Sequence, residues 1–596
     1  MGKIFKFDKD VDTDQIIASQ YLLYPTIDEM KVHTFESLDK EFAANVKPGD
    51  YVVASENFGC GSSREQAPSV LKALGVKAVI AKSFARIFYR NAINIGLPVI
   101  VCKELHDNVE NGDEMELKLT EGVVSVKGRD FECTKLPAYM QGILDQGGLI
   151  ASLNRENEQA SGSENHENNS GNTDGQNGTT KRPMTMAEKI IAAAAGVGEV
   201  KPGDIHTVEL DRLMSNDGTT HLTIDMYNKL ANPQIADIDK LVWIVDHNVP
   251  CDSVKTANSH KKMRDFAKAN SVKFYEGAGV CHQVMVENHV TAGELIFGAD
   301  SHTCAYGALG AFGTGVGCTD YLYAMVTGHS WLLVPETLRF NLSGKLPEGV
   351  YARDLILTII GQISANGANY KSMEFGGEGL KNLTIADRIA ICNLCVEAGA
   401  KTAIMEVDDI TLDYLKEHGR TPKAVMNPDA DAEYAEIYDI DLSTMKPIVA
   451  KPHFVDSVVP AEECIGTHID EAFLGSCNNG RIEDLRVGAE IIKGKKVHPL
   501  VRFLVVPASQ AVYAQALEEG ILKTFMDAGA IVMNPNCSVC WGSCQGVIGA
   551  DEVLISTGTR NFKGRAGSPD SYVYLASAAT VTASAIQGEI TTADRL

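Results

Sequence analysis

Three cysteines in two separate segments are the residues of this chain best suited to chemistry. Cys477 lies in G-S-C-N-N-G-R, and Cys537 and Cys540 lie in N-P-N-C-S-V-C-W-G. Three thiolates can hold a cubane iron–sulfur cluster at three corners and leave the fourth iron open. An open iron is a Lewis acid for a hydroxyl and a carboxylate, which favours lyase chemistry over electron transfer. Zinc sites and redox pairs share the C-x-x-C spacing, so the surrounding residues must decide between these interpretations.

The other cysteines are weaker candidates. Cys392 and Cys395 form a second C-x-x-C, but their segment is apolar with helical spacing, so we interpret them as core residues. Cys544 follows Cys540 closely and ranks below Cys477 as a third ligand. Fourteen cysteines in 596 residues are not a disulfide framework and indicate a reducing compartment.

Histidines and carboxylates follow apolar runs at three places. Asp246 and His247 come after L-V-W-I-V, His282 lies in G-A-G-V-C-H-Q, and Asp300 and His302 come after E-L-I-F-G-A. A carboxylate beside a histidine orients the ring and raises its basicity, as a general acid or base requires. Open α/β sheets place ligands where strands pass into loops. We therefore predict that these histidines act in catalysis.

Further polar segments could bind or orient an acid. Glu374, in K-S-M-E-F-G-G-E-G-L, is a candidate partner for one of the histidines, although a solvated loop acid is an equal interpretation. Arg560 and Arg565 flank a glycine in R-N-F-K-G-R and could clamp a carboxylate. In F-G-C-G-S-S-R-E, Ser62 and Ser63 open a helix whose N–H groups favour an anion. N-capping is the simpler role for both serines.

Two α/β bodies must position these residues. Residues 156–182 are rich in Asn, Gly, Ser and Glu, and they hold too few apolar side chains to fold. A coil of this length spans roughly 25–30 Å and would act as a tether. Residues 1–155 and 183–596 both alternate apolar strand candidates, such as 51–54 and 241–245, with helical patterns such as 65–74. This alternation predicts an α/β fold.

Charge and hydropathy exclude several classes of protein. The net charge of −24 argues against nucleic acid or an anionic membrane as a main partner. No stretch reaches the roughly 20 apolar residues of a spanning helix. The start, M-G-K-I-F-K-F-D-K-D, has no apolar signal-peptide core. We expect a cytoplasmic protein whose acid-binding site supplies its own arginines.

Long motifs in both bodies resemble one family. Residues 1–155 carry D-V-D-T-D-Q-I-I-A-S-Q-Y-L, F-G-C-G-S-S-R-E and A-K-S-F-A-R-I-F-Y-R-N-A. Residues 183–596 carry V-D-H-N, G-A-D-S-H-T, G-S-C-N-N-G-R-I-E-D-L, C-S-V-C-W-G and S-T-G-T-R-N-F-K-G-R-A-G. Nearly the whole chain resembles the aconitase superfamily, in its 3-isopropylmalate dehydratase branch, with the small and large subunits fused.

The resemblance implies an architecture and shows two departures. It implies an aconitase-like α/β fold in which an N-terminal swivelling domain is tethered to a three-domain body, with domains 183–335, 336–440 and 441–596. The segment C-N-N-G-R departs from the usual C-T-N-S-R or C-T-N-G-R, although the cysteine is kept. The order of small body before large body is also unusual.

The resemblance also implies roles for individual residues. Cys477, Cys537 and Cys540 would hold a 4Fe-4S cluster with one open iron. Ser62 would be the base, and His247, oriented by Asp246, would protonate the leaving hydroxyl. Supporting acid–histidine pairs would be Asp300 with His282 and Glu374 with His302. The substrate would be bound by Ser63, Arg64, Arg560, Arg565, Asn216 and Asp217.

The resemblance also implies that a loop of the first body, after the D-T-D-Q-I-I segment, contacts the variable part of the substrate. Leu22 and Leu23, in Y-L-L-Y-P-T, offer apolar surface that suits an isopropyl group. A third carboxylate would remain unpaired there, at a cost of several kcal/mol. We therefore expect a hydroxy-dicarboxylate and predict the interconversion of 2- and 3-isopropylmalate in leucine biosynthesis. The alternatives are a 2,3-dimethylmalate dehydratase, a homoaconitase or an aconitase.

Two non-catalytic interpretations also stay open. They are a cluster-free RNA-binding regulator and a zinc-binding structural protein. The charge of −24 and the presence of all three cysteines disfavour the regulator. In the catalytic interpretation Ser62 lies across the tether from the cysteines, so the two bodies must pair, within one chain or between chains.

Overall fold

The computed structural model divides the chain into two compact units. It describes residues 1–596 except 19–20, 22–23, 25, 61–64, 161–181 and 543. One unit comprises Met1–Lys181 with Leu222–Ala236 and Gly315–Ser330, and the other comprises Arg182–His221, Asp237–Thr314 and Trp331–Leu596. The three-domain division of residues 183–596 stays a prediction. Among the described residues, no helix is long and apolar enough to cross a membrane.

The first unit contains a seven-stranded sheet in the order β4-β3-β2-β1-β5-β6-β7. The four strands from β4 to β1 are parallel, whereas β5, β6 and β7 run antiparallel to their neighbours. Strands β2 and β3 are buried along their whole length, as expected for apolar runs inside a parallel sheet. The strands are β1 Gly2–Lys6, β2 Tyr51–Ala54, β3 Ala78–Ala81, β4 Val99–Val101, β5 Glu114–Lys118, β6 Val123–Val126 and β7 Arg129–Glu132.

One helix of the first unit, α12 (Cys318–Thr327), comes after residues 161–181 in the sequence. α5 (Arg86–Ile95) ends at Gly96, where φ is +83° and an added Cβ would lie 2.6 Å from the carbonyl oxygen of Gly147. This position therefore requires glycine. α12 contacts both α5 and α7. The other helices are α1 Thr13–Ile16, α2 Ile27–Met30, α3 Phe42–Asn45, α4 Gln66–Ala73, α6 Ala138–Asp145 and α7 Leu149–Ala160.

Two parallel sheets of the second unit follow each other along the chain. Their orders are β11-β10-β9-β12-β13 and β17-β16-β15-β18. One buried apolar cluster spans both sheets and includes Cys392 and Cys395, so these cysteines are core residues as predicted. The strands are β9 Arg212–Asn216, β10 Leu241–Val245, β11 Lys273–Glu276, β12 Leu295–Gly298, β13 Phe312–Gly315, β15 Thr337–Ser343, β16 Ser372–Gly376, β17 Thr402–Met405 and β18 Glu436–Asp441. β8 (Ile205–Glu209) and β14 (His329–Leu333) form a separate pair.

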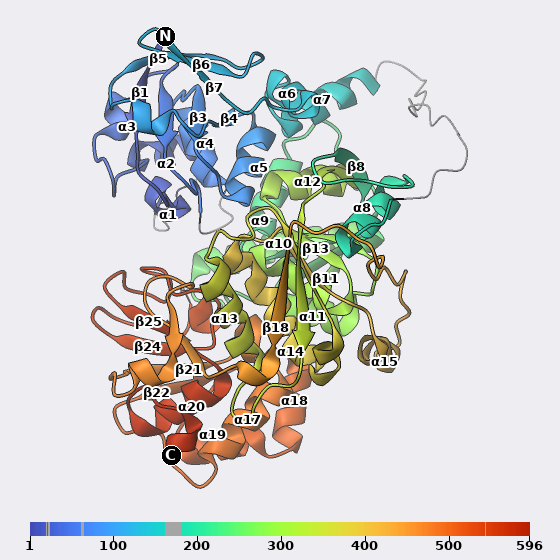
Figure 1. Cartoon of the computed structure of the whole chain (residues 1–596), viewed down its shortest axis with the longest axis vertical. Coiled ribbons are helices and arrows are strands. Elements are labelled where there is room, and N and C mark those ends of the chain that lie inside the picture. The colour runs from blue at the N-terminus through green and yellow to red at the C-terminus, as the bar shows by residue number, and fades with distance from the viewer. Residues whose placement is uncertain (19–20, 22–23, 25, 61–64, 161–181, 543) are drawn as a thin grey trace. The chain divides into compact units, whose positions relative to one another are not determined.

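The third sheet of this unit has its own core. Its order is β20-β19-β25-β24-β21-β22-β23, and α17, α19 and α20 lie beside it in Figure 1. The strands are β19 Ile448–Ala450, β20 Val458–Pro460, β21 Glu471–Leu474, β22 Arg502–Val505, β23 Ile531–Val532, β24 Val553–Ser556 and β25 Tyr572–Leu575. The α-helices assigned to residues 183–596, apart from α12, are α8 Met186–Ala195, α9 Thr220–Tyr227, α10 Val254–Asn270, α11 Cys281–Asn288, α13 Ala352–Ile363, α14 Ile385–Leu394, α15 Asp409–Glu417, α16 Ser476–Asn479, α17 Ile482–Ile492, α18 Gln510–Glu518, α19 Ile521–Ala528 and α20 Ala578–Gln587.

Candidate active site

The predicted histidine segments follow neighbouring parallel strands. Strand β9 ends at Asn216, β10 ends just before Asp246, and β12 is followed by Ala299 and Asp300. These strands are adjacent in the order β10-β9-β12. Because parallel strands end at the same edge, their polar residues gather where open α/β sheets bind ligands.

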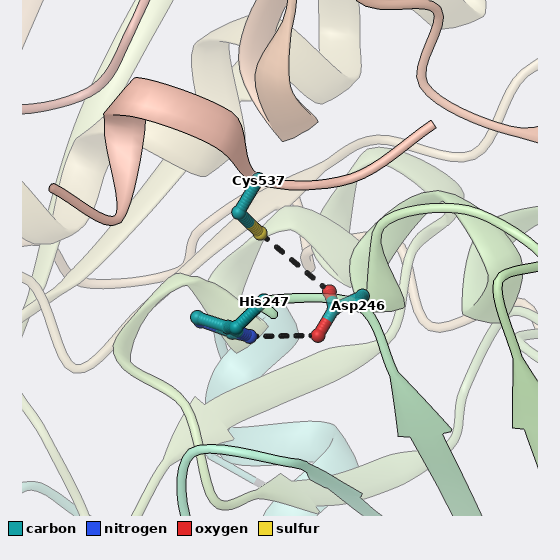
Figure 2. A group of neighbouring side chains, drawn as sticks. All are labelled: Asp246, His247 and Cys537. Atoms are coloured by element: carbon teal, nitrogen blue, oxygen red, sulfur yellow. Dashed lines mark hydrogen bonds and ion pairs between the residues drawn. The ribbon is translucent and has the colours of Figure 1, made fainter. Parts of the chain in front are cut away.

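Asp246 and His247 form a buried pair beside a cysteine. The Nδ1 of His247 lies 2.7 Å from Oδ1 of Asp246, and the Sγ of Cys537 lies 3.7 Å from Oδ2 of the same carboxylate (Figure 2). The ring also meets Trp541 edge-on at 4.6 Å. Burial alone would lower the pKa of His247, but the Asp246 and Asp217 carboxylates outweigh it and raise the pKa well above its ordinary value. The imidazolium is therefore a proton donor held ready by its carboxylate.

Asp217 positions the loop that carries this pair. Its Oδ1 accepts the backbone N–H groups of Asp246 and His247 at 3.2 and 3.0 Å, and its Oδ2 accepts that of Asn248 at 3.0 Å. The Nε2 of His260 lies 3.1 Å from Oδ2. With its side chain 2% exposed and used in this way, Asp217 has a positioning role. The predicted substrate contact of Asp217 stays a prediction.

A second cluster joins His282, Asp300 and His302. One donor atom from each lies within 4.8 Å of the others. Asp300 Oδ1 is 2.8 Å from His282 Nε2, as the predicted pairing requires, and accepts the backbone N–H of His302 at 2.8 Å. Asn216 donates from Nδ2 to Asp300 Oδ2 at 3.4 Å. Burial alone would raise the pKa of Asp300, but the two histidines hold it well below its usual range.

The carboxylate that partners His302 is Glu397, which the sequence analysis missed. Glu397 Oε1 lies 3.2 Å from His302 Nε2 and accepts Arg560 Nε at 2.7 Å. Arg560 also donates from Nη2 to the Ser301 hydroxyl at 3.0 Å. Burial would raise the pKa of Glu397, but Arg560 and His302 lower it. Arg560 is thus oriented next to the histidine cluster.

The predicted pairing of Glu374 with His302 is wrong. Glu374 lies in β16, and its carboxylate accepts the backbone N–H groups of Met186 and Ala187, at 3.2 and 2.8 Å, where α8 begins. These acceptors are useful there because the first N–H groups of a helix lack partners within the helix. Glu374 therefore stabilises a helix start.

The three cysteines predicted as ligands are brought together by two loops. Cys477 lies in α16, and Cys537 and Cys540 lie at either end of the turn Ser538–Cys540. Cys477 and Cys537 share a small apolar cluster, and Cys540 lies close enough to raise the pKa of both thiols electrostatically. Burial raises the pKa of Cys477 and Cys537, whereas the nearby Arg565 helps to lower that of Cys540 against the effect of burial. Three close thiols are a donor set that fits an iron–sulfur cluster.

Arg353, also missed, ties the loop of Cys477 to the segment Thr557–Gly558, which lies beside Cys540. It is fully buried, and its Nη1 donates to the side-chain oxygens of Asn478 and Asn479 at 2.5 and 3.0 Å and to the Thr557 carbonyl at 2.7 Å. Its Nη2 donates to the carbonyl of Gly558, where an added Cβ would lie 3.5 Å from the Sγ of Cys540. No feature of the segment Y-A-R-D marks this arginine in the sequence.

Other thiols near the site differ in their placement. Cys281 is buried at the start of α11, donates its backbone N–H to Asp246 at 2.5 Å, and lies within electrostatic range of Cys477. Its only signal in the sequence is its place directly before His282. Cys544 donates its thiol to the Ser538 carbonyl at 3.7 Å.

Five predicted site residues lie outside the described residues. They are Ser62, Ser63, Arg64, Leu22 and Leu23. Their predicted roles stay predictions. Within the second unit, the described candidates other than Glu374 form one constellation of histidine–carboxylate pairs, a buried arginine and three thiols. Such a constellation is typical of an enzyme that adds or removes water with metal assistance.

Comparison with known proteins identifies the class to which this fold and site belong. The chain is a member of the aconitase family: the model of the aconitase family (aconitate hydratase) matches residues 188–588, and that of the aconitase C-terminal domain matches residues 11–104. The C-terminal-domain match thus comes first along the chain, as the predicted order of small body before large body requires. The chain is a hydro-lyase of this family.

Particular relatives match large parts of the chain. A probable 3-isopropylmalate dehydratase large subunit from Methanothermobacter thermautotrophicus is 47% identical over 411 residues, 68% of this chain and 98% of the relative. A probable methanogen homoaconitase large subunit from the same organism is 47% identical over 415 residues, 68% and 97% of the two chains. A solved 3-isopropylmalate dehydratase from Methanocaldococcus jannaschii is 44% identical and covers 27% of this chain and 96% of that one, with a TM-score of 0.26.

Proposed function

We propose that this chain interconverts 2-isopropylmalate and 3-isopropylmalate by dehydration and rehydration, with a 4Fe-4S cluster held by Cys477, Cys537 and Cys540. The observation that carries this proposal is the contact between the Asp246–His247 acid pair and the thiol of Cys537. A proton donor so close to cluster ligands suits the loss of a hydroxyl group from a hydroxy acid. The dehydratase large subunit at 47% identity supports the choice of substrate.

Each residue has one task in this reaction. A cluster held at three corners supplies an open iron, a Lewis acid for the hydroxyl and one carboxylate of the substrate. His247 donates a proton from Nε2 to the departing hydroxyl oxygen, because Asp246 holds the ring at Nδ1. Arg560, oriented by Glu397, binds a carboxylate. Ser62, assigned by family resemblance, takes the proton from the neighbouring carbon, and water then adds to the alkene in the opposite sense.

Iron content tests the cluster assignment. Anaerobically purified protein is expected to be brown with about four irons per chain. Cys477→Ser should lose most of this iron, whereas Cys544→Ser, a matched thiol in the same region, should keep it. A colourless protein that holds zinc, or equal iron in both variants, would overturn the assignment.

A second candidate substrate has specific support. The probable homoaconitase large subunit is as similar to this chain as the dehydratase subunit, at 47% identity. Isopropylmalate, dimethylmalate, citraconate-like and homocitrate substrates should be assayed side by side. We expect isopropylmalate to be preferred and Leu23→Arg to shift the preference toward tricarboxylates. Faster turnover of homocitrate by the unchanged chain would favour the homoaconitase.

Complementation between chains tests how the two bodies supply the site. In this proposal Ser62 comes from residues 1–155 and the cluster ligands come from residues 183–596. Ser62→Ala and Cys477→Ser should each be inactive. If activity recovers when the two variants are mixed, the bodies that pair belong to different chains. If the mixture stays inactive, they belong to the same chain. Full activity of Ser62→Ala alone would remove the serine from the mechanism.

A further inference from the structure

A cysteine, a histidine and a carboxylate form a relay at the surface of the second unit. The Sγ of Cys251 lies 3.1 Å from Nδ1 of His260, and Nε2 of His260 lies 3.1 Å from Oδ2 of Asp217. His260 and Asp217 are buried. Of the fourteen cysteines, all of which the structure describes, Cys251 alone is exposed.

The hydrogen bonds of His260 assign its tautomer. The Asp217 carboxylate can only accept, so the proton of a neutral His260 lies on Nε2. Burial alone would raise the pKa of Asp217, but its bonds to His247 and His260 hold it well below the usual range, so it stays a carboxylate. The lone pair on Nδ1 therefore faces the thiol of Cys251. A nucleophile, a base and a group that orients the base are the three parts of an activated thiol.

We propose that Cys251 is a site of reversible modification, at which its thiol exchanges with a low-molecular-weight disulfide. His260 takes the thiol proton, and the Cys251 sulfur attacks one sulfur of the disulfide. The disulfide S–S bond breaks as the new one forms, and the leaving thiolate takes the proton from His260. No other oxidant is consumed, because the attacking disulfide is reduced as Cys251 is oxidised.

Asp217 connects this site to the proposed proton donor. The carboxylate that orients His260 also accepts the backbone N–H groups of Asp246, His247 and Asn248. When a group is attached to Cys251, Nδ1 of His260 loses its contact with the thiol. The resulting movement of His260 is passed to the His247 loop by Asp217, which contacts both. This consequence, which rests on the proposed function, is a reversible fall in activity on modification.

The rate of modification tests the site without using activity. The folded full chain is treated at pH 7 with bis(2-hydroxyethyl) disulfide, a neutral probe, and each cysteine peptide is measured by mass spectrometry. Cys251 should be the first cysteine modified, and it should react at least about threefold faster than in the urea-unfolded chain. Equal or slower reaction in the folded chain would overturn the proposal.

Two histidine variants show whether Cys251 reacts fast because His260 activates its thiol or only because the thiol is exposed. His260→Gln should slow the modification of Cys251 about tenfold, because the thiol loses its base. His418→Gln is the control, since His418 bonds to the Tyr414 carbonyl at the surface and should leave the rate unchanged. An unchanged rate in a folded His260→Gln chain would overturn the proposal. Should that variant not fold, the comparison of folded and unfolded native chain decides the question.

Activity then tests only the connection to His247. Modification of the cluster-loaded chain should lower turnover several-fold, dithiothreitol should restore it, and Cys251→Ser should keep full activity throughout. Labelling of Cys251 without loss of activity would reject the connection but keep the site. A chain inactive on every substrate would contradict the proposed function and leave the labelling result standing.

Discussion

A buried ion pair inside the first unit links helices from opposite sides of residues 156–182. Arg90, in α5, donates from Nε and Nη2 to the two carboxylate oxygens of Asp320, in α12, at 2.5 and 2.7 Å. Nη2 also donates to the Ser330 hydroxyl at 3.1 Å. Arg90 is 2% exposed and Asp320 is fully buried, so neither charge can be hydrated if the other is removed.

The size of the effect follows from this burial. Asp320→Leu leaves a buried guanidinium without its counter-charge, which costs about 3–5 kcal/mol. If the chain is cut between the two helices, that cost corresponds to an increase of about 150- to 5,000-fold in the dissociation constant of the two fragments. Replacing both residues, as Arg90→Met with Asp320→Leu, removes both charges and should recover most of the loss.

The assay requires only the full chain with a protease site inserted within residues 161–181. After cleavage, the dissociation constant of the two fragments is measured by dilution and size-exclusion chromatography. Lys523→Met is a control, because the Lys523–Asp527 pair is exposed and contributes less than about 1 kcal/mol. A single variant Asp320→Leu that changes the constant by less than threefold would refute the reasoning, as would a double variant no better than the single one.

Three further predictions concern the second unit. Arg353→Met should weaken retention of the cluster by about 10- to 100-fold, because it frees the Cys477 loop from the segment beside Cys540; iron loss to a chelator measures this. Glu397→Gln should lower kcat/KM about 100-fold, whereas Glu374→Gln should change it less than threefold. Burial raises the pKa of Glu374 from 4.5 to about 7, so folding favours its protonated form. The stability that this proton contributes is present at low pH and is lost between about pH 4.5 and 7. Urea midpoints should therefore fall over this range in the native chain more than in Glu374→Gln, by up to about 3 kcal/mol in unfolding free energy.

The strands were predictable because burial inside a parallel sheet requires continuous apolar runs. The runs at 51–54 and 241–245 are strands β2 and β10 with the predicted bounds. The helical pattern over 65–74 is α4, which spans Gln66–Ala73. The pairing of Asp246 with His247 was also predictable, because the two residues are adjacent in the sequence and their contact does not depend on the rest of the fold.

The partners of distant side chains were not predictable in this way. Glu374 and Glu397 lie 23 residues apart, and local sequence does not show which one reaches His302. Only the packing of the turn at Cys395–Ala398 against Ser301–Leu309 decides the matter. Arg353 was missed for the same reason, because its partners lie more than 100 residues away along the chain.

The balance of charge in the site is local and differs from that of the chain. A net charge of −24 would repel a dicarboxylate from an average surface, so the sequence predicted that the site supplies its own cations. The structure extends that prediction to histidines as well as arginines. Burial alone would raise the pKa of Asp217, Asp300 and Glu397, yet all three are lowered by cationic neighbours. These carboxylates therefore stay charged and hold His247, His282, His302 and Arg560 in place. In the proposed reaction, an acidic substrate would meet oriented histidines and a guanidinium, and the carboxylates that balance their charge lie behind them in the fold.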